Sequence, residues 1–365
     1  MSGSASDQPA GARVAVVLGT GLIGTSVGLA LGGAGWTVHL ADPDVRALSQ
    51  AAELGAGSLD EPDADVVDVV VVCAPPDATP AAVAGALERF PRAAVTDVAS
   101  LKASIVDALA GHVARDRFVG GHPLAGRETS GPGGARSDLF EGRSWVLTPM
   151  GVEDAEALAA VRSAVGEIGA FIVEMKPREH DEAVAVVSHV PQVMASLTAA
   201  RLVDLEATSL ALAGQGLRDV TRIAASDPWL WSQIIGGNAD AVVEILDEVA
   251  DDLADLRRAL TGEQALRSQS VRDLVTRGNA GRSRIPGKHG AAAQRYAFVA
   301  VVIPDEPGGL ARLFDVVGTL GVNIEDLALE HSPGQPVGLA TLAVQPAAAP
   351  GLMDDLSAAG WVVHR

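Results

Sequence analysis

Short β-branched runs alternate with apolar helical stretches over the first half of the chain. The predicted strands are Arg13–Leu18, Trp36–Ala41, Val66–Cys73, Ala94–Val98, Arg117–Gly120, Ser144–Thr148 and Ala170–Glu174. The predicted helices between the first of these strands are Leu22–Leu31, Ala47–Leu54 and Ala81–Phe90. Strands that alternate with helices of about ten residues indicate parallel βαβ units whose sheet is covered on both faces. We therefore expect a doubly wound α/β domain here.

From Glu179 to Leu260 the pattern changes to apolar residues at helical spacing, with little strand signal. A heptad-like seam closes this segment, formed by Val242, Leu246, Val249, Leu253, Leu256 and Leu260. Such a seam packs either on the helix's own domain or on a second subunit. The pattern leaves both interpretations open.

The stretch Thr261–Arg295 is basic and contains several glycines, and we interpret it as a linker or long ordered loop. The residues after it predict a small unit whose strands and helices follow in the order βαββαβ, which is typical of a ferredoxin-like fold. Its predicted elements are Tyr296–Ile303, Gly309–Leu320, Ile324–His331, Val337–Val344, Ala349–Ala359 and Trp361–His364. The expected division is a disordered tail (1–12), a nucleotide-binding domain (13–178), a helical domain (179–262), a basic linker (263–294) and this last unit (295–365).

Composition excludes several classes of protein. The chain has 365 residues, 48% of them hydrophobic and 20% charged, which suits a globular protein of two or three domains. Its net charge of −19 has the wrong sign for nucleic-acid binding. A single cysteine, Cys73, excludes an internal disulfide, and we predict no metal. We see no membrane-length apolar run and no secretory pattern at the N-terminus, so we expect a cytoplasmic protein that binds no membrane.

A glycine motif, Gly19-Thr20-Gly21-Leu22-Ile23-Gly24, directly follows the first predicted strand and opens the first helix. In that context G-x-G-x-x-G is typical of a Rossmann-type dinucleotide site. Gly19 permits the tight turn, Gly21 lets the backbone approach a pyrophosphate, and Gly24 allows close helix–strand packing. The helix N-terminus supplies free N–H donors for the phosphates.

Asp42 follows the second predicted strand, at the position expected of the acid that accepts hydrogen bonds from the adenosine ribose. A carboxylate at this place repels a 2′-phosphate. We therefore predict that the cofactor is NAD and not NADP.

Further candidates stand at strand ends, where doubly wound sheets bind their ligands. Ser100 follows the fourth predicted strand, and before any resemblance is considered the sequence favours a role as N-cap of the next helix. His122 follows two glycines at the end of the next strand, and a neutral imidazole there can take a proton from an alcohol. Farther along, Arg218 and Arg222 suggest an anion site, because guanidinium groups bind carboxylates. The competing interpretation is a surface ion pair, for instance of Arg218 with Asp219 or Asp227.

Together these motifs resemble the prephenate dehydrogenase family. The similar segments are the glycine motif, D-x-x-S-x-K (Asp97–Lys102), G-x-H-P-x-x-G-x-E-x-S-G (Gly120–Gly131), S-H-x-P (Ser188–Pro191) and R-D-x-T-R-I-A-x-S-D-P-x-x-W (Arg218–Trp231). The resemblance covers about Arg13 to Leu260. It implies a Rossmann-type domain followed by an all-α dimerisation domain, an active site in the cleft between them, and a homodimer.

The resemblance also implies roles for single residues. His122 is the catalytic histidine, with Ser100 forming a hydrogen bond near it, and Arg222 holds the ring carboxylate. The other substrate-binding positions are His189, Gln192, Glu128 on the cleft rim, Arg218 and Trp231. Many family members have a second histidine, S-H-x-P-H, where this chain has Gln192, so the residue that reads the pyruvyl end differs here.

The implied reaction is an oxidative decarboxylation of prephenate to 4-hydroxyphenylpyruvate. His122 accepts the 4-hydroxyl proton, hydride passes from the same carbon to NAD, and the ring carboxylate leaves as CO2. Arogenate is the alternative substrate, and a hydroxyacid or imine reductase is a more distant enzyme alternative on the same fold. A non-catalytic amino-acid sensor is disfavoured because His122, Ser100, Arg222 and Asp42 occur together.

The C-terminal unit resembles an ACT domain at Pro304–Leu310 and Gly321–Ile324. Such domains commonly pair and bind amino acids where they meet. Backbone N–H groups around Gly308 and Gly309, next to Asp305, suit an amino acid carboxylate, and the Asn323 side chain suits the ammonium group. We expect an aromatic amino acid effector, tyrosine first, with phenylalanine or tryptophan as alternatives. The competing interpretation is a unit that only adds dimer contact area.

Overall fold

The computed structural model describes residues 13–126, 131–285, 296–331 and 336–364, in two units. The first unit holds the chain up to Leu197 together with Ile223–Glu248, and the second holds Thr198–Arg222 together with Val249–Arg365. The predicted tail at residues 1–12 lies outside the described residues, and so do 286–294 of the predicted linker.

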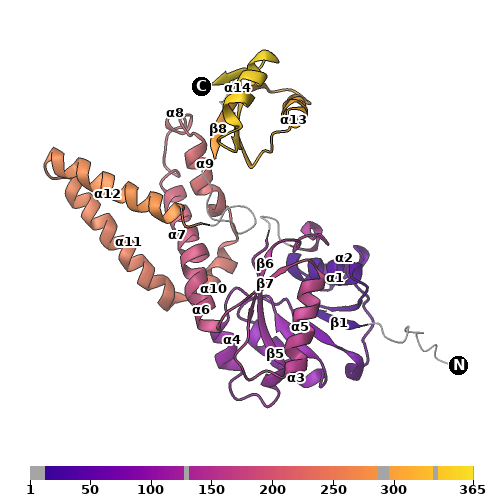
Figure 1. Cartoon of the computed structure of the whole chain (residues 1–365). Helices are drawn as coiled ribbons and strands as arrows, with labels where there is room; N and C mark the ends of the chain where they lie inside the picture. Colours follow the sequence, from indigo (N-terminus) through magenta and orange to yellow (C-terminus); the bar gives the residue numbers. More distant parts are fainter. Residues whose placement is uncertain (1–12, 127–130, 286–295, 332–335, 365) are drawn as a thin grey trace. The chain divides into compact units, whose positions relative to one another are not determined.

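The first unit is built on a seven-stranded sheet in the order β2-β1-β3-β4-β5-β6-β7 (Figure 1). Its strands are β1 (Val14–Leu18), β2 (Thr37–Ala41), β3 (Val69–Val72), β4 (Ala94–Asp97), β5 (Phe118–Pro123), β6 (Ser144–Thr148) and β7 (Phe171–Glu174). The neighbours pair in parallel except β5 with β6, which is antiparallel. The expected pattern of parallel βαβ units thus ends at β5, because β6 returns antiparallel to it. In the described part of the β5–β6 connection the helical element is a 3₁₀ turn, Pro132–Gly134, and not the α-helix that usually makes a parallel crossover.

Helices cover both faces of this sheet. Val27, Leu31, Val161 and Val165 of α1 (Leu22–Gly33) and α5 (Ala155–Glu167) join the core on one face. Val83, Leu87 and Ile105 of α3 (Thr79–Arg89) and α4 (Ala103–Ala108) join the core on the other. The remaining helix of this part is α2 (Val45–Glu53). The sequence analysis missed α5, which the Asp154 side chain caps at its N-terminus.

Residues Pro177–Ala200 continue the first unit as one helical stretch: α6 (Pro177–Val184), a π-helical turn (Ala185–His189) and α7 (Val190–Ala200). By length and composition alone this stretch is able to cross a membrane. Its buried positions include His180, Asp181, His189 and Gln192. Ala185 and Val190 pack against Val242 of α11 (Ala239–Leu260), which follows α10 (Pro228–Gly237). These contacts make the stretch part of a protein core.

The second unit contains α8 (Ala207–Leu210), α9 (Gln215–Thr221) and α12 (Gln264–Arg282), with the later part of α11. Arg277 of α12 pairs with Asp252 of α11 at 2.8 Å, so the two helices form a hairpin (Figure 1). The loop interpretation of residues 263–294 is therefore wrong over Gln264–Arg282. Gln, Leu, Arg and Ala are good helix formers, and their propensity outweighs that of Gly278 and Gly281.

The C-terminal part of the second unit has the predicted βαββαβ order. Its elements are β8 (Ala297–Pro304), α13 (Gly309–Thr319), β9 (Asp326–His331), β10 (Val337–Val344), α14 (Ala349–Ala358) and β11 (Val362–His364). The strands form an antiparallel sheet in the order β11-β8-β10-β9. Val299, Val301 and Ile303 of β8 pack in the core, whereas Phe298 is 70% exposed. The sheet is thus covered on one face, as in a ferredoxin-like fold.

Candidate active site

The glycine loop between β1 and α1 has the backbone geometry that a dinucleotide site requires. Gly19 adopts a φ of +101°, and a Cβ there would lie 2.4 Å from the carbonyl oxygen of Cys73. A Cβ on Gly24 would lie 1.8 Å from the carbonyl oxygen of Gly19, whereas one on Gly21 meets nothing within 4 Å. The N-cap residue Gly21 offers no side chain to the first amides of α1, and within the described residues no side-chain cap is present there. The free amides and the open approach at Gly21 fit a pyrophosphate.

Asp42, directly after β2, is held against this loop. Its Oδ2 accepts hydrogen bonds from the Thr20 amide at 2.5 Å and the Thr20 hydroxyl at 3.0 Å, and its Oδ1 accepts from the Asp44 amide at 2.7 Å. The side chain is half-buried. These bonds fix a carboxylate beside the phosphate-binding turn, as the binding of a ribose requires.

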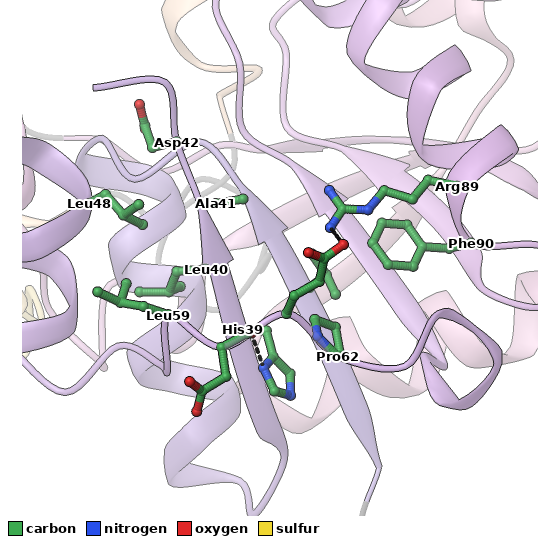
Figure 2. A pocket seen from close by; sticks show the side chains of 12 residues that line it. His39, Leu40, Ala41, Asp42, Leu48, Leu59, Pro62, Arg89 and Phe90 are labelled. Carbon is green, nitrogen blue, oxygen red and sulfur yellow. Dashed lines mark hydrogen bonds and ion pairs between the residues drawn. The ribbon is translucent and has the colours of Figure 1, made fainter. Parts of the chain in front are cut away.

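A pocket of about 250 Å³ lies against β2, with Asp42 at one end and His39 at the other (Figure 2). Arg89 and Phe90 of the α3 end form another part of its wall. The Arg89 guanidinium pairs with the Glu61 carboxylate at 2.6 Å. His122 does not line this pocket, so the pocket belongs to the Asp42 side of the unit.

A buried ion pair supports the strand that carries His122. The Lys102 ammonium bonds to the Asp97 carboxylate and donates to the carbonyl oxygen of Gly121 at 2.6 Å. The Asp97 carboxylate in turn accepts from the Gly121 amide at 3.1 Å. A Cβ on Gly121 would lie 2.5 Å from the Asp97 carbonyl oxygen, and one on Gly120 would lie 2.4 Å from the Thr148 hydroxyl. The two glycines are therefore needed for close packing over the ion pair.

His122, on β5, begins a chain of hydrogen-bonded side chains. Its Nδ1 lies 2.8 Å from Nε2 of His180 on α6, and Nδ1 of His180 lies 2.8 Å from Oδ1 of Asp181. The two imidazole rings meet edge to face, with an interplanar angle of 77°. The sequence analysis missed His180 and Asp181, because nothing in a helical segment marks which polar residues face a strand end.

Burial favours the neutral forms of His122 and His189. It is the largest cause that lowers the pKa of His122 well below its usual 6.5, and His180, Lys102 and His189 lower it further. Burial also lowers the pKa of His189 to about 4 and lowers the pKa of Lys102. A neutral imidazole is the form able to accept a proton.

Ser100 is half-buried between β4 and α4, close in sequence to Asp97 and Lys102. It does not cap the following helix: α4 begins at Ala103, and its first amides donate to the carboxylate of Asp181 instead. The capping interpretation of Ser100 is therefore wrong. The described residues include no hydrogen bond between Ser100 and His122, and the catalytic role of Ser100 stays a prediction.

The candidate substrate residues of the first unit lie on the helical stretch and on α10. His189 is 1% exposed, and its Nδ1 lies 3.1 Å from the Asn238 side-chain amide. Its ring contacts Trp231 edge to face at 6.2 Å between centroids. Gln192 is also buried and donates to the Ser196 hydroxyl at 3.4 Å. Glu128 lies outside the described residues.

Arg218 and Arg222 belong to the second unit, where both are exposed. The alternative of surface ion pairs for Arg218 finds no support in the described part of the chain. Asp219 accepts from Gln215 at 2.6 Å, and Asp227 caps α10 by accepting from the amides of Trp229 and Leu230.

The candidate effector residues lie around the N-terminus of α13. Gly308 adopts a φ of +85°, and a Cβ on Gly309 would lie 2.7 Å from the Pro304 carbonyl oxygen. No side chain caps α13. The amide of Asp305 donates to the Pro336 carbonyl oxygen, and the Asn323 side chain donates to Glu325 at 2.8 Å. The turn at Gly308 therefore has a conformation that only glycine adopts readily, and its role in binding an effector stays a prediction.

A dinucleotide loop and a neutral histidine at a strand end define a nucleotide-dependent oxidoreductase. Residues 27–174 match the family model of the prephenate dehydrogenase nucleotide-binding domain. Residues 176–274 match the family model of the prephenate dehydrogenase dimerization domain. The chain belongs to the prephenate dehydrogenase family.

Individual relatives agree with this assignment. The probable prephenate dehydrogenase NovF of Streptomyces niveus is 37% identical, over 96% of this chain and 99% of that protein. The crystal structure of Aquifex aeolicus prephenate dehydrogenase in complex with hydroxyphenyl propionate and NAD+ has a TM-score of 0.64 at 27% identity, over 75% of this chain and 100% of that one. Synechocystis arogenate dehydrogenase has a TM-score of 0.62 at 27% identity, over 74% of this chain and 99% of that one.

Proposed function

We propose that this chain catalyses the NAD-dependent oxidative decarboxylation of prephenate to 4-hydroxyphenylpyruvate. The observation that carries the proposal is His122: a neutral imidazole at the end of β5, in the same unit as an uncapped dinucleotide loop. Family membership and the NAD-bound Aquifex structure support it.

The side chains have separate tasks in this proposal. His122 accepts the proton of the substrate's 4-hydroxyl group. The amides at the start of α1 and the Asp42 carboxylate hold NAD, which supplies the hydride acceptor when bound. Arg222 binds the ring carboxylate that leaves as CO2. The remaining substrate contacts are proposed for Ser100, His189, Gln192, Trp231, Arg218 and Glu128.

Arogenate is the second candidate substrate. The Synechocystis arogenate dehydrogenase structure matches this chain at the same identity as the Aquifex prephenate dehydrogenase structure. Gln192 replaces a common histidine where the side chain of the substrate is read. The test is the absorbance of reduced nicotinamide with prephenate and arogenate, each with NAD and NADP. We expect turnover with prephenate and NAD, and no reaction with either substrate overturns the proposal.

The proposed assembly is a homodimer formed through the helical part of the chain. In the single chain, Leu253 and Leu260 of the α11 seam are 62% and 48% exposed. Leu266 and Val275 of α12 are 59% and 54% exposed. Burial of such apolar side chains against a second copy is favourable by roughly 25 cal/mol per Å². Sedimentation of Leu253→Asp against wild type tests this arrangement, with a shift toward monomer expected.

Regulation by an aromatic amino acid is the proposed role of the C-terminal unit. Its glycine turn at Gly308 and Gly309 leaves the N-terminus of α13 without a side-chain cap, which suits a carboxylate. Tyrosine is the expected effector, since it follows from the product of the proposed reaction. The cytoplasmic location also stays a prediction, supported by NAD use and a single cysteine.

A further inference from the structure

His180 and Asp181 have no assigned role, yet they connect the proposed base to the start of a helix. The His180 side chain has no exposed surface, and Asp181 is 7% exposed. Both sit on α6, whereas His122 sits on β5, so the contact joins segments 58 residues apart. We propose that His180 and Asp181 are positioning residues that fix His122 as the tautomer with a bare Nε2. This inference rests on the proposed function of His122.

The first step concerns the hydrogen bonds that Asp181 accepts. Its Oδ1 accepts from the Lys102 amide at 2.9 Å, and its Oδ2 accepts from the Ala103 amide at 2.8 Å. Both carboxylate oxygens of Asp181 therefore act as hydrogen-bond acceptors. An ionised carboxylate only accepts hydrogen bonds, so Nδ1 of His180 carries the proton in their 2.8 Å contact.

The donor role of His180 Nδ1 determines the hydrogen-bond direction between His180 and His122. In a neutral imidazole one nitrogen donates and the other accepts, so Nε2 of His180 is an acceptor. Nδ1 of His122, 2.8 Å away, must then donate. The proton of neutral His122 is thereby placed on Nδ1, and its Nε2 keeps the lone pair. That nitrogen is the one available to take the substrate's hydroxyl proton.

Both nitrogens of His180 are used in this chain. Its ring has no exposed surface, Nδ1 faces Asp181 and Nε2 faces His122. Lys102, already paired with Asp97, and the neutral His189 are the other titratable groups that act on His122.

The same chain holds His122 after it has taken up a proton. Imidazolium donates from both nitrogens, so the Nδ1 bond to His180 persists and becomes charge-assisted. The carboxylate of Asp181 stands at the far end of the chain and compensates part of the charge. In serine hydrolases a buried carboxylate holds the catalytic histidine in the correct tautomer and orientation. Asp181 has the same task in this proposal, and it acts on His122 through the additional imidazole of His180.

The direct test is nitrogen NMR of the full-length protein labelled with ¹⁵N-histidine, with the His122 signal assigned from His122→Asn. We expect the Nδ1–H tautomer of His122 in wild type, and a shift toward Nε2–H in Asp181→Asn. An Nε2–H tautomer in wild type overturns the proposal. This measurement needs no substrate, so it stands even if prephenate is not turned over.

The kinetic test compares Asp181→Asn with Asp154→Asn, which removes the charge of another helix-capping aspartate, that of α5. We expect kcat of Asp181→Asn to fall by about 10²–10⁴-fold, the usual range for loss of a general base, with KM for NAD unchanged. Asp154→Asn should keep wild-type kcat. Turnover of Asp181→Asn within threefold of wild type, or an equal loss in Asp154→Asn, overturns the positioning role.

Discussion

The two sheets of this protein place their usable residues in opposite ways. Strands β3 and β4 of the parallel sheet are buried at every position, because helices cover both faces. In β8 of the antiparallel sheet, buried and more exposed residues alternate. Polar chemistry in the first sheet is therefore confined to strand ends, at Asp42 and His122. In the second sheet the outward positions of β8 stay partly exposed, with Phe298 exposed to 70%.

We propose that the first unit carries the base, the cofactor site and the substrate residues His189, Gln192 and Trp231, and that the second unit contributes Arg222 and the effector site. Substitutions in the first unit should change kcat or the use of NAD. Substitutions in the second should change the KM for prephenate or the response to an effector. The following predictions test that division, from the largest expected effect to the smallest.

Replacement of the proposed base should have the largest effect. His122→Asn should lower kcat by about 10²–10⁴-fold, because general-base assistance is lost. The affinity for NAD, measured by fluorescence titration, should stay near wild type because the glycine loop is untouched. Near-normal turnover in this variant would remove His122 from the mechanism.

Removal of the proposed carboxylate clamp tests the second unit. Arg222→Ala should raise the KM for prephenate by about 10- to 150-fold, since Arg222 is exposed and a hydrogen bond to a charged group contributes about 1.5–3 kcal/mol. The KM for NAD should hardly change. Arg258→Ala is a matched control, because Arg258 is an exposed arginine of α11 paired with Asp255. Equal rises in both KM values would indicate a structural ion pair instead.

Cofactor choice depends on one carboxylate of the first unit. Asp42→Ala should raise the KM for NAD by about 10- to 150-fold, given about 1.5–3 kcal/mol for a hydrogen bond to a charged group. The KM for NADP should fall relative to that for NAD, because repulsion of the 2′-phosphate is gone. An unchanged NAD/NADP ratio, or wild-type use of NADP, contradicts the assignment.

Feedback control should depend on the second sheet. A chain truncated near Gly290 should remain active and lose its response to tyrosine, whereas the full chain should be inhibited. Allosteric coupling is typically about 1–3 kcal/mol, or about 5- to 150-fold in affinity. Titrations of both forms with tyrosine, phenylalanine and tryptophan make the comparison. No response of the full chain to any of them would leave the sheet a structural role only.

The smallest predicted effect is on stability in mild acid. His189 has a folded-state pKa of about 4, below its unfolded value, so the unfolded chain binds the proton first as pH falls. Stability should be constant above about pH 6.5 and decline below it, within the window down to about pH 4. Melting temperatures between pH 7 and 5 measure this decline. His189→Gln should flatten the curve, and equal slopes in both proteins would contradict the prediction.

Local patterns predicted most of this fold. The glycine loop and Asp42 were placed correctly because each stands directly after an apolar strand, and His122 lies near the end of β5, close to where it was predicted. The π-helical turn and the polar residues on α6 were not found, because contact with β5 is set by packing between distant segments. Helix α12 was missed because its basic residues and glycines concealed good helix formers. Asp181 caps α4 by accepting from the amide of Ala103, which lies 78 residues earlier in the chain. No local sequence pattern indicates a contact over that separation.

The capping of α4 by Asp181 affects how the two domains of this family are exchanged, in evolution or in protein design. Asp181 and His180 lie in the segment matched as the dimerization domain, yet they complete a helix start and a histidine of the nucleotide-binding domain. The boundary between the two matched segments therefore cuts through one working unit. A fragment that ends before Pro177 retains the glycine loop and Asp42 but has lost the partners of His122. Chimeras of this family should accordingly be joined after α6.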